Sequence, residues 1–121
     1  MRPKSEKCKY RGVRPRRSGV FDAWLARDNS MISLGSFRDP LDAAWVADFA
    51  RYMTYGLNPT AWKRIKRPPA KPNFPPCVND NINRQCILRI LFSHNILDTA
   101  TMAKRLREYD IIAARPAPKA S

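Results

Sequence analysis

Three short strand-like runs followed by one capped helix constrain the fold of this chain more than any other feature. Residues 10–14, 20–27 and 31–37 are rich in β-forming residues and are separated by turn residues. The next segment opens with Asp39-Pro40, an N-cap residue followed by proline at the first helical position, and its helix should run to about Tyr55 and stop at Gly56. The sequence therefore predicts an α+β fold, in which a three-stranded antiparallel sheet packs on one helix and a C-terminal helical hairpin follows.

Side-chain alternation predicts the two faces of the sheet. One face should carry Phe21, Ala23, Leu25, Ile32 and Leu34. The other should carry Trp24, Ala26, Met31 and Ser33. The helix offers the sheet a stripe of small residues, namely Ala43, Ala47, Ala50 and Thr54. A second stripe is bulky and requires cover from another segment: Trp45, Phe49, Tyr52 and Met53.

The segment after the helix is expected to strap across the domain. Residues 56–78, which we call the strap, contain six prolines and favour extended backbone, with Trp62, Ile65 and Phe74 as apolar anchors. Two helices should follow, the first capped by Asn79 or Asp80 and the second capped near Asp98 or Thr99. This hairpin either covers the bulky stripe or forms a dimer, and cover is favoured because a short amphipathic pair is marginal alone.

The predicted organisation is one domain with appendages. It comprises a basic N-terminal arm (1–8), a sheet-and-helix domain (9–76), a C-terminal helical extension (77–112) and a disordered tail (113–121).

The charge of the chain indicates a polyanionic partner. Lys and Arg number 23 against 10 acidic residues, which gives a formal net charge of +13. Such a field attracts nucleic acid before any specific contact forms. No apolar run approaches the roughly twenty residues of a spanning helix, and the N-terminus is charged rather than signal-like, so we expect no membrane partner and no secretion.

Catalysis and cofactors are not indicated. Cys8, Cys77 and Cys86 match no zinc spacing, and His94 is the single histidine. We expect the cysteines to behave as small hydrophobic residues in a reducing intracellular compartment. Because no nucleophile motif, acid–base pair or glycine-rich phosphate loop is present, the sequence predicts a protein that is no enzyme and needs no cofactor.

Five motifs occur in a recognisable order along the chain. They are Tyr10-Arg11-Gly12-Val13-Arg14-x-Arg16, Gly19 followed by Phe21, Leu34-Gly35-Ser36-Phe37, Ala43-Ala44-x-x-Ala47-Asp48 and Asn73-Phe74-Pro75. On these motifs the region from about Lys9 to Pro75 resembles the APETALA-two / ethylene-response-factor DNA-binding domain of plant type. The resemblance implies a three-stranded sheet packed on one helix, with the sheet docked in the major groove of DNA.

The resemblance also implies where DNA contacts fall. By position, the family's base-reading and phosphate-contacting arginines correspond to Arg11, Arg14 and Arg16 here. Arginine suits this task because its planar fork bonds both O6 and N7 of guanine. Strand position and charge add further candidate DNA-binding residues: Lys9, Arg17, Trp24, Arg27, Ser33, Lys63 and Arg64.

The chain departs from the family pattern on the second and third strands. Ser18 stands where the family usually has a DNA-contacting tryptophan. Trp24 and Ala26 replace glutamate and arginine, and Met31 and Ser33 replace arginine and tryptophan. Only the first-strand half of the reading surface therefore keeps the family pattern, so the family's GC-rich preference is not carried over. Trp24 therefore has three possible roles: it packs on a sugar or a thymine methyl, it binds a protein partner, or it lies under the strap.

These features predict a nuclear, sequence-specific binder of double-stranded DNA that regulates transcription. Residues 63–67, Lys-Arg-Ile-Lys-Arg, suit a nuclear-localisation or phosphate-binding cluster. Two alternatives remain: a protein-interaction adaptor that uses Trp24, Met31 and Ser33, and the DNA-targeting module of a mobile-element protein. The C-terminal helices are the candidate surface for a protein partner or for self-association.

Overall fold

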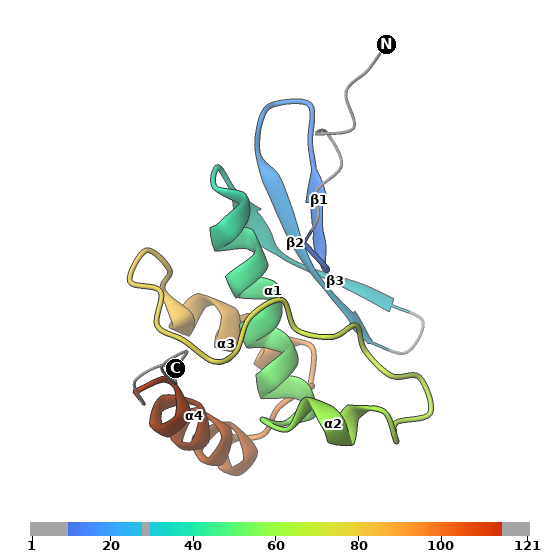
Figure 1. Ribbon diagram of the computed structural model, residues 1–121, viewed down its shortest axis with the longest axis vertical. Coiled ribbons are helices and arrows are strands. Elements are labelled where there is room, and N and C mark those ends of the chain that lie inside the picture. Colours follow the sequence, from blue (N-terminus) through green and yellow to red (C-terminus); the bar gives the residue numbers. More distant parts are fainter. Residues whose placement is uncertain (1–9, 28–29, 115–121) are drawn as a thin grey trace, which may run out of the picture.

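A three-stranded sheet packs against one long helix, which three further helices support on its other sides (Figure 1). The computed structural model describes residues 10–27 and 30–114. The strands are β1 (Val13–Pro15), β2 (Phe21–Arg27) and β3 (Ser30–Phe37). The helices are α1 (Pro40–Tyr55), α2 (Pro59–Trp62), α3 (Arg84–Ser93) and α4 (Thr99–Ala113). The predicted α+β class is confirmed.

Two predicted boundaries fall at the edges of the described residues. The N-terminal arm and Lys9 lie outside them, as do residues 115–121 of the predicted tail. Ala113 belongs to α4, so the prediction that the tail begins at residue 113 was wrong at that position.

The sheet is antiparallel, with strand order β1-β2-β3. β1 is shorter than the predicted run, because Tyr10 to Gly12 form a bend and a turn before it. Between β2 and β3 the partners shift from Ala23↔Gly35 to Trp24↔Ser33, so that Leu34 is the extra residue of a bulge. Gly35 adopts φ +121° there, which a residue with a side chain rarely does.

The predicted faces of the sheet are confirmed. Ala23, Leu25, Ile32 and Leu34 are all buried, and Phe21 is half-buried against them. On the opposite side Ala26, Met31 and Ser33 are exposed, whereas Trp24 is half-buried.

Helix α1 begins and ends as the sequence predicts. The Asp39 carboxylate accepts a hydrogen bond from the Leu41 amide at 2.9 Å, and Pro40 occupies the first turn. The Gly56 amide donates to the Tyr52 carbonyl at the other end. Both signals are local in sequence, which explains why they were readable without the structure.

The C-terminal helices cover the bulky stripe of α1, as predicted. Trp45 and Phe49 stack with ring centroids 5.0 Å apart, and Tyr109 of α4 stands edge-on to them at 6.3 and 5.1 Å. The Tyr109 hydroxyl donates to the Cys77 carbonyl at 2.8 Å. Arg105 donates to the carbonyls of Met53 and Thr54, at the end of α1. Segments distant in sequence therefore cover the bulky stripe of α1 and bond the carbonyls at its C-terminal end.

One helix start was predicted wrongly and one helix was missed. Asn83, not Asn79 or Asp80, caps α3, because its side chain accepts from the Gln85 amide at 3.0 Å. Asn79 instead caps a turn by accepting from the Asn81 amide. The short helix α2 inside the strap was not expected. The second predicted cap is confirmed, since Asp98 accepts from the Thr101 amide.

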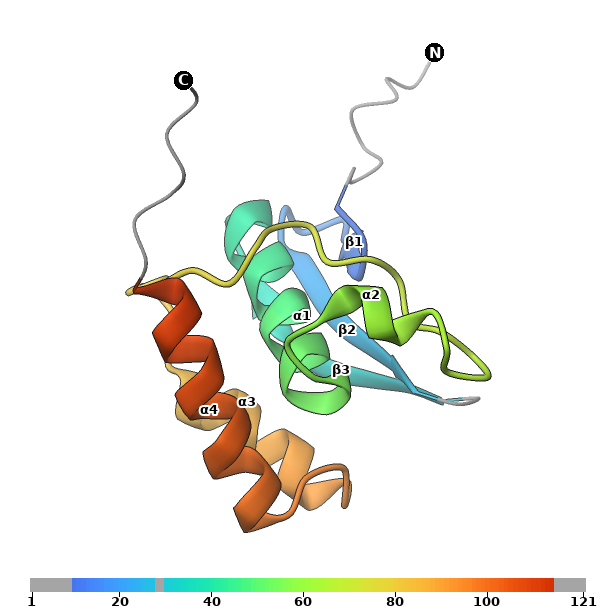
Figure 2. The ribbon, with the colours of Figure 1, turned by 60° about the horizontal axis from the view of Figure 1, so that its bottom comes forward.

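The strap runs beside α1 and is held by its predicted anchors (Figures 1 and 2). Trp62 is buried, with its ring centroid 5.7 Å from that of Tyr52. Ile65 and Phe74 are half-buried against the same core. The Tyr52 hydroxyl donates to the Phe74 carbonyl at 2.8 Å. The strap is thus a structural part of the domain.

Candidate nucleic-acid interface

The face of the sheet that points away from α1, which we call the outer face, carries no helix in the described residues (Figure 2). Helix α1 packs on all three strands from the other side, and α2, α3 and α4 pack on α1. Strand register and alternation assign the outer face to Arg14, Asp22, Trp24, Ala26, Met31, Ser33 and Ser36. Among the described residues, no helix therefore competes with a partner for this surface.

One half of the outer face is charged. Arg14 pairs across the strands with Asp22, which in turn pairs with Ser36. The Arg16 Nε lies 3.6 Å from the Asp22 carboxylate, and the Arg16 side chain is 57% exposed. The Ser36 hydroxyl donates to the other Asp22 oxygen. Asp22 thereby orients Arg16, a role that strand alternation would have suggested but that the sequence analysis did not assign.

Arg14 is positioned by Trp24. Its guanidinium carbon lies 5.6 Å from the centroid of the indole ring, within the range of a cation–π contact. Arg14 is exposed, whereas the indole Nε1 is buried and has no hydrogen-bond partner among the described residues. The ring thus supports the guanidinium from below and limits its rotamer freedom.

The other half of the outer face is uncharged. Because β1 pairs only with Phe21 to Ala23, the sheet narrows beyond that point to a two-stranded ribbon of β2 and β3. Across this ribbon Trp24 pairs with Ser33, and Ala26 pairs with Met31. Met31 is 47% exposed, an unusual position for a large apolar side chain.

Arg11 holds the strap. Its Nε donates to the Lys71 carbonyl at 2.7 Å, and its Nη2 donates to the Pro72 carbonyl at 2.8 Å. Its backbone amide donates to Asn73 Oδ1 at 2.8 Å. These carbonyls already engage two of its guanidinium nitrogens, and DNA contact by Arg11 stays a prediction.

A buried hydrogen-bond network joins the start of β1 to α1 and to the strap. The Asp48 carboxylate, 2% exposed, accepts from Arg51 Nη2 at 2.9 Å, from both nitrogens of Asn73, and from the Phe74 amide at 2.7 Å. Arg51 Nη2 also donates to the Arg11 carbonyl. Burial lowers the pKa of the Arg51 guanidinium, and the Asp48 carboxylate opposes this shift.

Gly12 leaves the space that this hydrogen-bond network requires. A Cβ added at Gly12 would lie 2.8 Å from Arg51 Nη1 and 2.9 Å from the Ala47 Cβ, and the residue has φ +84°. The motifs around Gly12, Asp48 and Asn73 therefore meet at one place, although they are distant in sequence. They set where β1 starts, and hence where Arg14 and Arg16 stand.

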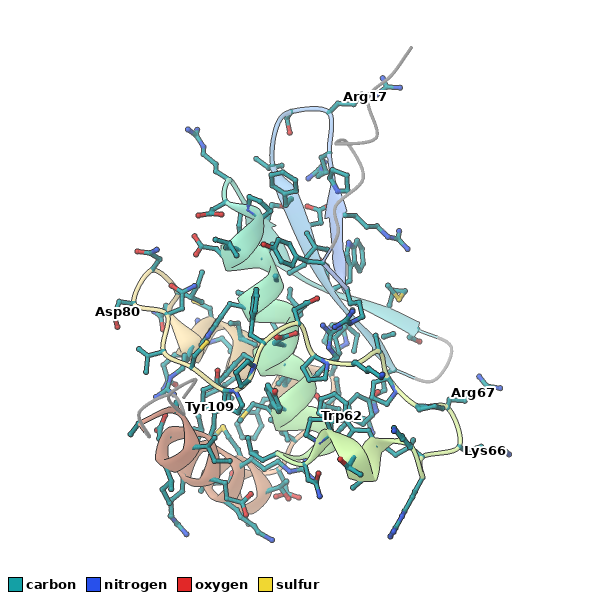
Figure 3. All side chains as sticks on the ribbon, in the orientation of Figure 1. Arg17, Trp62, Lys66, Arg67, Asp80 and Tyr109 are labelled. Carbon is teal, nitrogen blue, oxygen red and sulfur yellow. The ribbon has the colours of Figure 1, made fainter. Side chains whose placement is uncertain are left out.

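Further basic candidates lie at both ends of the sheet. Arg17 is exposed at the tip of the β1–β2 turn (Figure 3). The basic strap cluster comprises Lys63, Arg64, Lys66 and Arg67, all exposed, and its loop lies beside the far ends of β2 and β3 in both ribbon views. Alternation places Arg27, half-buried, on the same side as Leu25, away from the outer face. Of the predicted residues, the structure thus gathers Arg14, Arg16, Trp24 and Ser33 on one surface.

The described part of the chain contains no group of three or more His, Cys, Asp or Glu residues that could hold a metal ion. None of its helices combines the length and the apolar character needed to cross a bilayer.

Neither the known protein-family models nor the curated proteins contain a match to this chain.

Proposed function

We propose that this protein binds double-stranded DNA sequence-specifically through the outer face of its sheet and regulates transcription in the nucleus. The observation that carries the proposal is an open sheet face on which Arg14 and Arg16 stand exposed from one strand edge. The major groove, about 12 Å wide, admits a two-stranded β-ribbon. The net charge of +13 supplies the long-range attraction.

Arg14 is the proposed base reader. An arginine that bonds guanine O6 and N7 discriminates against other bases by roughly 1–3 kcal/mol. Its contact with the Trp24 ring reduces the rotamer entropy lost on binding, because the guanidinium is already restrained. Arg16 is the proposed second contact, since its side chain is 57% exposed and its pair with Asp22, at 3.6 Å, leaves the guanidinium accessible to a phosphate or base.

Phosphate contacts are proposed at the ends of the sheet. Arg17 lies at one end, and the basic strap cluster lies at the other. Contacts of this kind fix the register on the duplex and make affinity fall steeply with salt. The same cluster is proposed to serve nuclear import before DNA is bound.

Selection from random duplexes with the full chain tests the proposal. We expect one enriched motif containing a guanine, and we expect Arg14→Ala to weaken binding to it by about 5- to 150-fold, the equivalent of a bidentate base contact. Binding to unrelated duplexes should change far less. Arg89→Ala, an exposed arginine on α3, is the matched control and should bind as the parent does. Equal losses on selected and unrelated duplexes would refute base reading by Arg14.

The adaptor alternative is favoured by one observation, the exposure of Met31 beside the half-buried Trp24. Exposed apolar and aromatic groups of this kind are frequent where proteins bind each other. Salt-sensitive DNA binding without any enriched motif would support the adaptor.

A further inference from the structure

We infer that the uncharged half of the outer face reads the C5-methyl group of thymine, so that the preferred duplex carries thymine beside the guanine bound by Arg14. The inference rests on the proposed function and adds the base class recognised by the ribbon of β2 and β3. The surface in question is formed by Ala26, Met31 and Ser33, with Trp24 at its border.

The shape of this surface suits the floor of the major groove. It is presented by two strands alone, because β1 ends before Trp24 in the register. The major groove admits a two-stranded ribbon of this kind. The Ala26 and Met31 pair therefore reaches base edges rather than backbone.

The chemistry of this surface selects one groove feature. Ala26 and Met31 offer no hydrogen-bond donor to a guanine or adenine edge and no oxygen acceptor for a cytosine amino group. The thymine C5-methyl is the only methyl group that a base pair displays in the major groove. Met31 is flexible and polarisable, so its exposed side chain adapts to a methyl group. Ser33, directly across from Trp24, is a hydroxyl donor for the neighbouring O4 acceptor.

The register also limits where the thymine lies. Ala26 is four residues along β2 from Asp22, the cross-strand partner of Arg14. Four residues of strand span about 13 Å. At about 3.4 Å of helix rise per base pair, the thymine should lie within about four base pairs of the guanine.

The test compares thymine with uracil in the selected duplex. Each thymine is replaced singly by deoxyuridine, which removes the methyl group and keeps the pairing and the O4 acceptor. Binding of the full chain is measured by fluorescence anisotropy at fixed salt. At one or two positions within this span we expect about a fourfold loss, the affinity equivalent of burying one methyl-sized group.

A variant assigns the effect to the protein surface. Met31→Ala should bind the thymine duplex more weakly than the parent does and should no longer distinguish thymine from uracil at one position. Leu41→Ala is the matched control, because Leu41 is 49% exposed on α1, away from the outer face, and its thymine-to-uracil ratio should stay unchanged. Both side chains are exposed, so neither variant should fail to fold.

The outcomes separate this inference from the proposed function. If no uracil substitution matters, or if Met31→Ala keeps the parent ratio, thymine reading is wrong, while an Arg14-dependent motif would still support DNA binding. If selection enriches no motif and Arg14→Ala has no effect, both proposals fail together.

Discussion

Asp48→Asn should destabilise the fold by about 3–5 kcal/mol, although it changes only one atom of a side chain. The carboxylate is 2% exposed and accepts four hydrogen bonds, from Arg51, from two nitrogens of Asn73 and from the Phe74 amide. The substituted amide turns one acceptor into a donor and removes the charge that compensates the buried Arg51 guanidinium. Loss of one partner of a buried ion pair costs about this much.

Urea unfolding at neutral pH measures the effect. With a slope of about 2 kcal/mol per molar urea, the midpoint should fall by roughly 2 M, a large part of the total stability of a domain of this size. Asp110→Asn is the matched control. Asp110 pairs with Arg84 at 2.6 Å, but it is 52% exposed, so its loss should cost less than about 1 kcal/mol.

A double substitution tests the physical reason. In the Asp48→Asn background, Arg51→Met should recover part of the lost stability, because no uncompensated cation then remains buried. The reasoning is refuted if Asp48→Asn costs no more than Asp110→Asn, or if removing Arg51 deepens the loss additively.

Three other predictions address the packing and the charge. Gly12→Ala should cost about 1–3 kcal/mol more in urea unfolding than Gly19→Ala, because both glycines have φ +84° but an added Cβ meets neighbours only at Gly12; equal losses would contradict the close packing. Tyr109→Phe should cost about 1–3 kcal/mol, because the Cys77 carbonyl and amide lose their partner. Burial raises the pKa of Tyr109 above its ordinary 10.0, so the contribution of its hydroxyl to the free energy of unfolding is complete below pH 10 and is lost as the pH rises further. Above pH 10, the urea midpoint of the parent should therefore fall more steeply with pH than that of Tyr109→Phe. Replacing three residues of the basic strap cluster with alanine, at positions 63, 64 and 66, should reduce the slope of log affinity against log salt by about 3, and an unchanged slope would exclude phosphate contact by those residues.

Some features were predictable because they depend on neighbours in sequence. Asp39-Pro40 and Gly56 set the limits of α1 through hydrogen bonds and backbone angles within a turn of each end. Alternation along β2 and β3 placed Leu25 and Ile32 inside, and Trp24 outside the core. The bulky stripe of α1 demanded cover, and Tyr109 of α4 provides it.

Other features were not predictable, because several neighbouring residues suit the same structural role or because a residue distant in sequence determines which contact forms. Four residues from 79 to 83 are Asn or Asp and therefore suitable helix caps, and packing of α3 on α1 selects Asn83. Arg11 has the sequence context of a DNA-contacting arginine, yet strap carbonyls 60 and 61 residues away engage its guanidinium. The bulge at Leu34 follows from the register of two strands, which no single strand encodes.

By itself, then, the sequence determined the class of fold, the limits of the core helix and the excess of positive charge, because propensity, capping and alternation act over a few residues. Only the tertiary structure decided which groups of the chain each exposed arginine contacts. Arg11 is drawn into the strap by carbonyl groups that need donors, whereas Arg14 is held outward over Trp24 and Arg16 beside Asp22. The physical reason is that a guanidinium binds whichever acceptor or ring the fold brings within reach, and that distance is set by packing rather than by the order of residues.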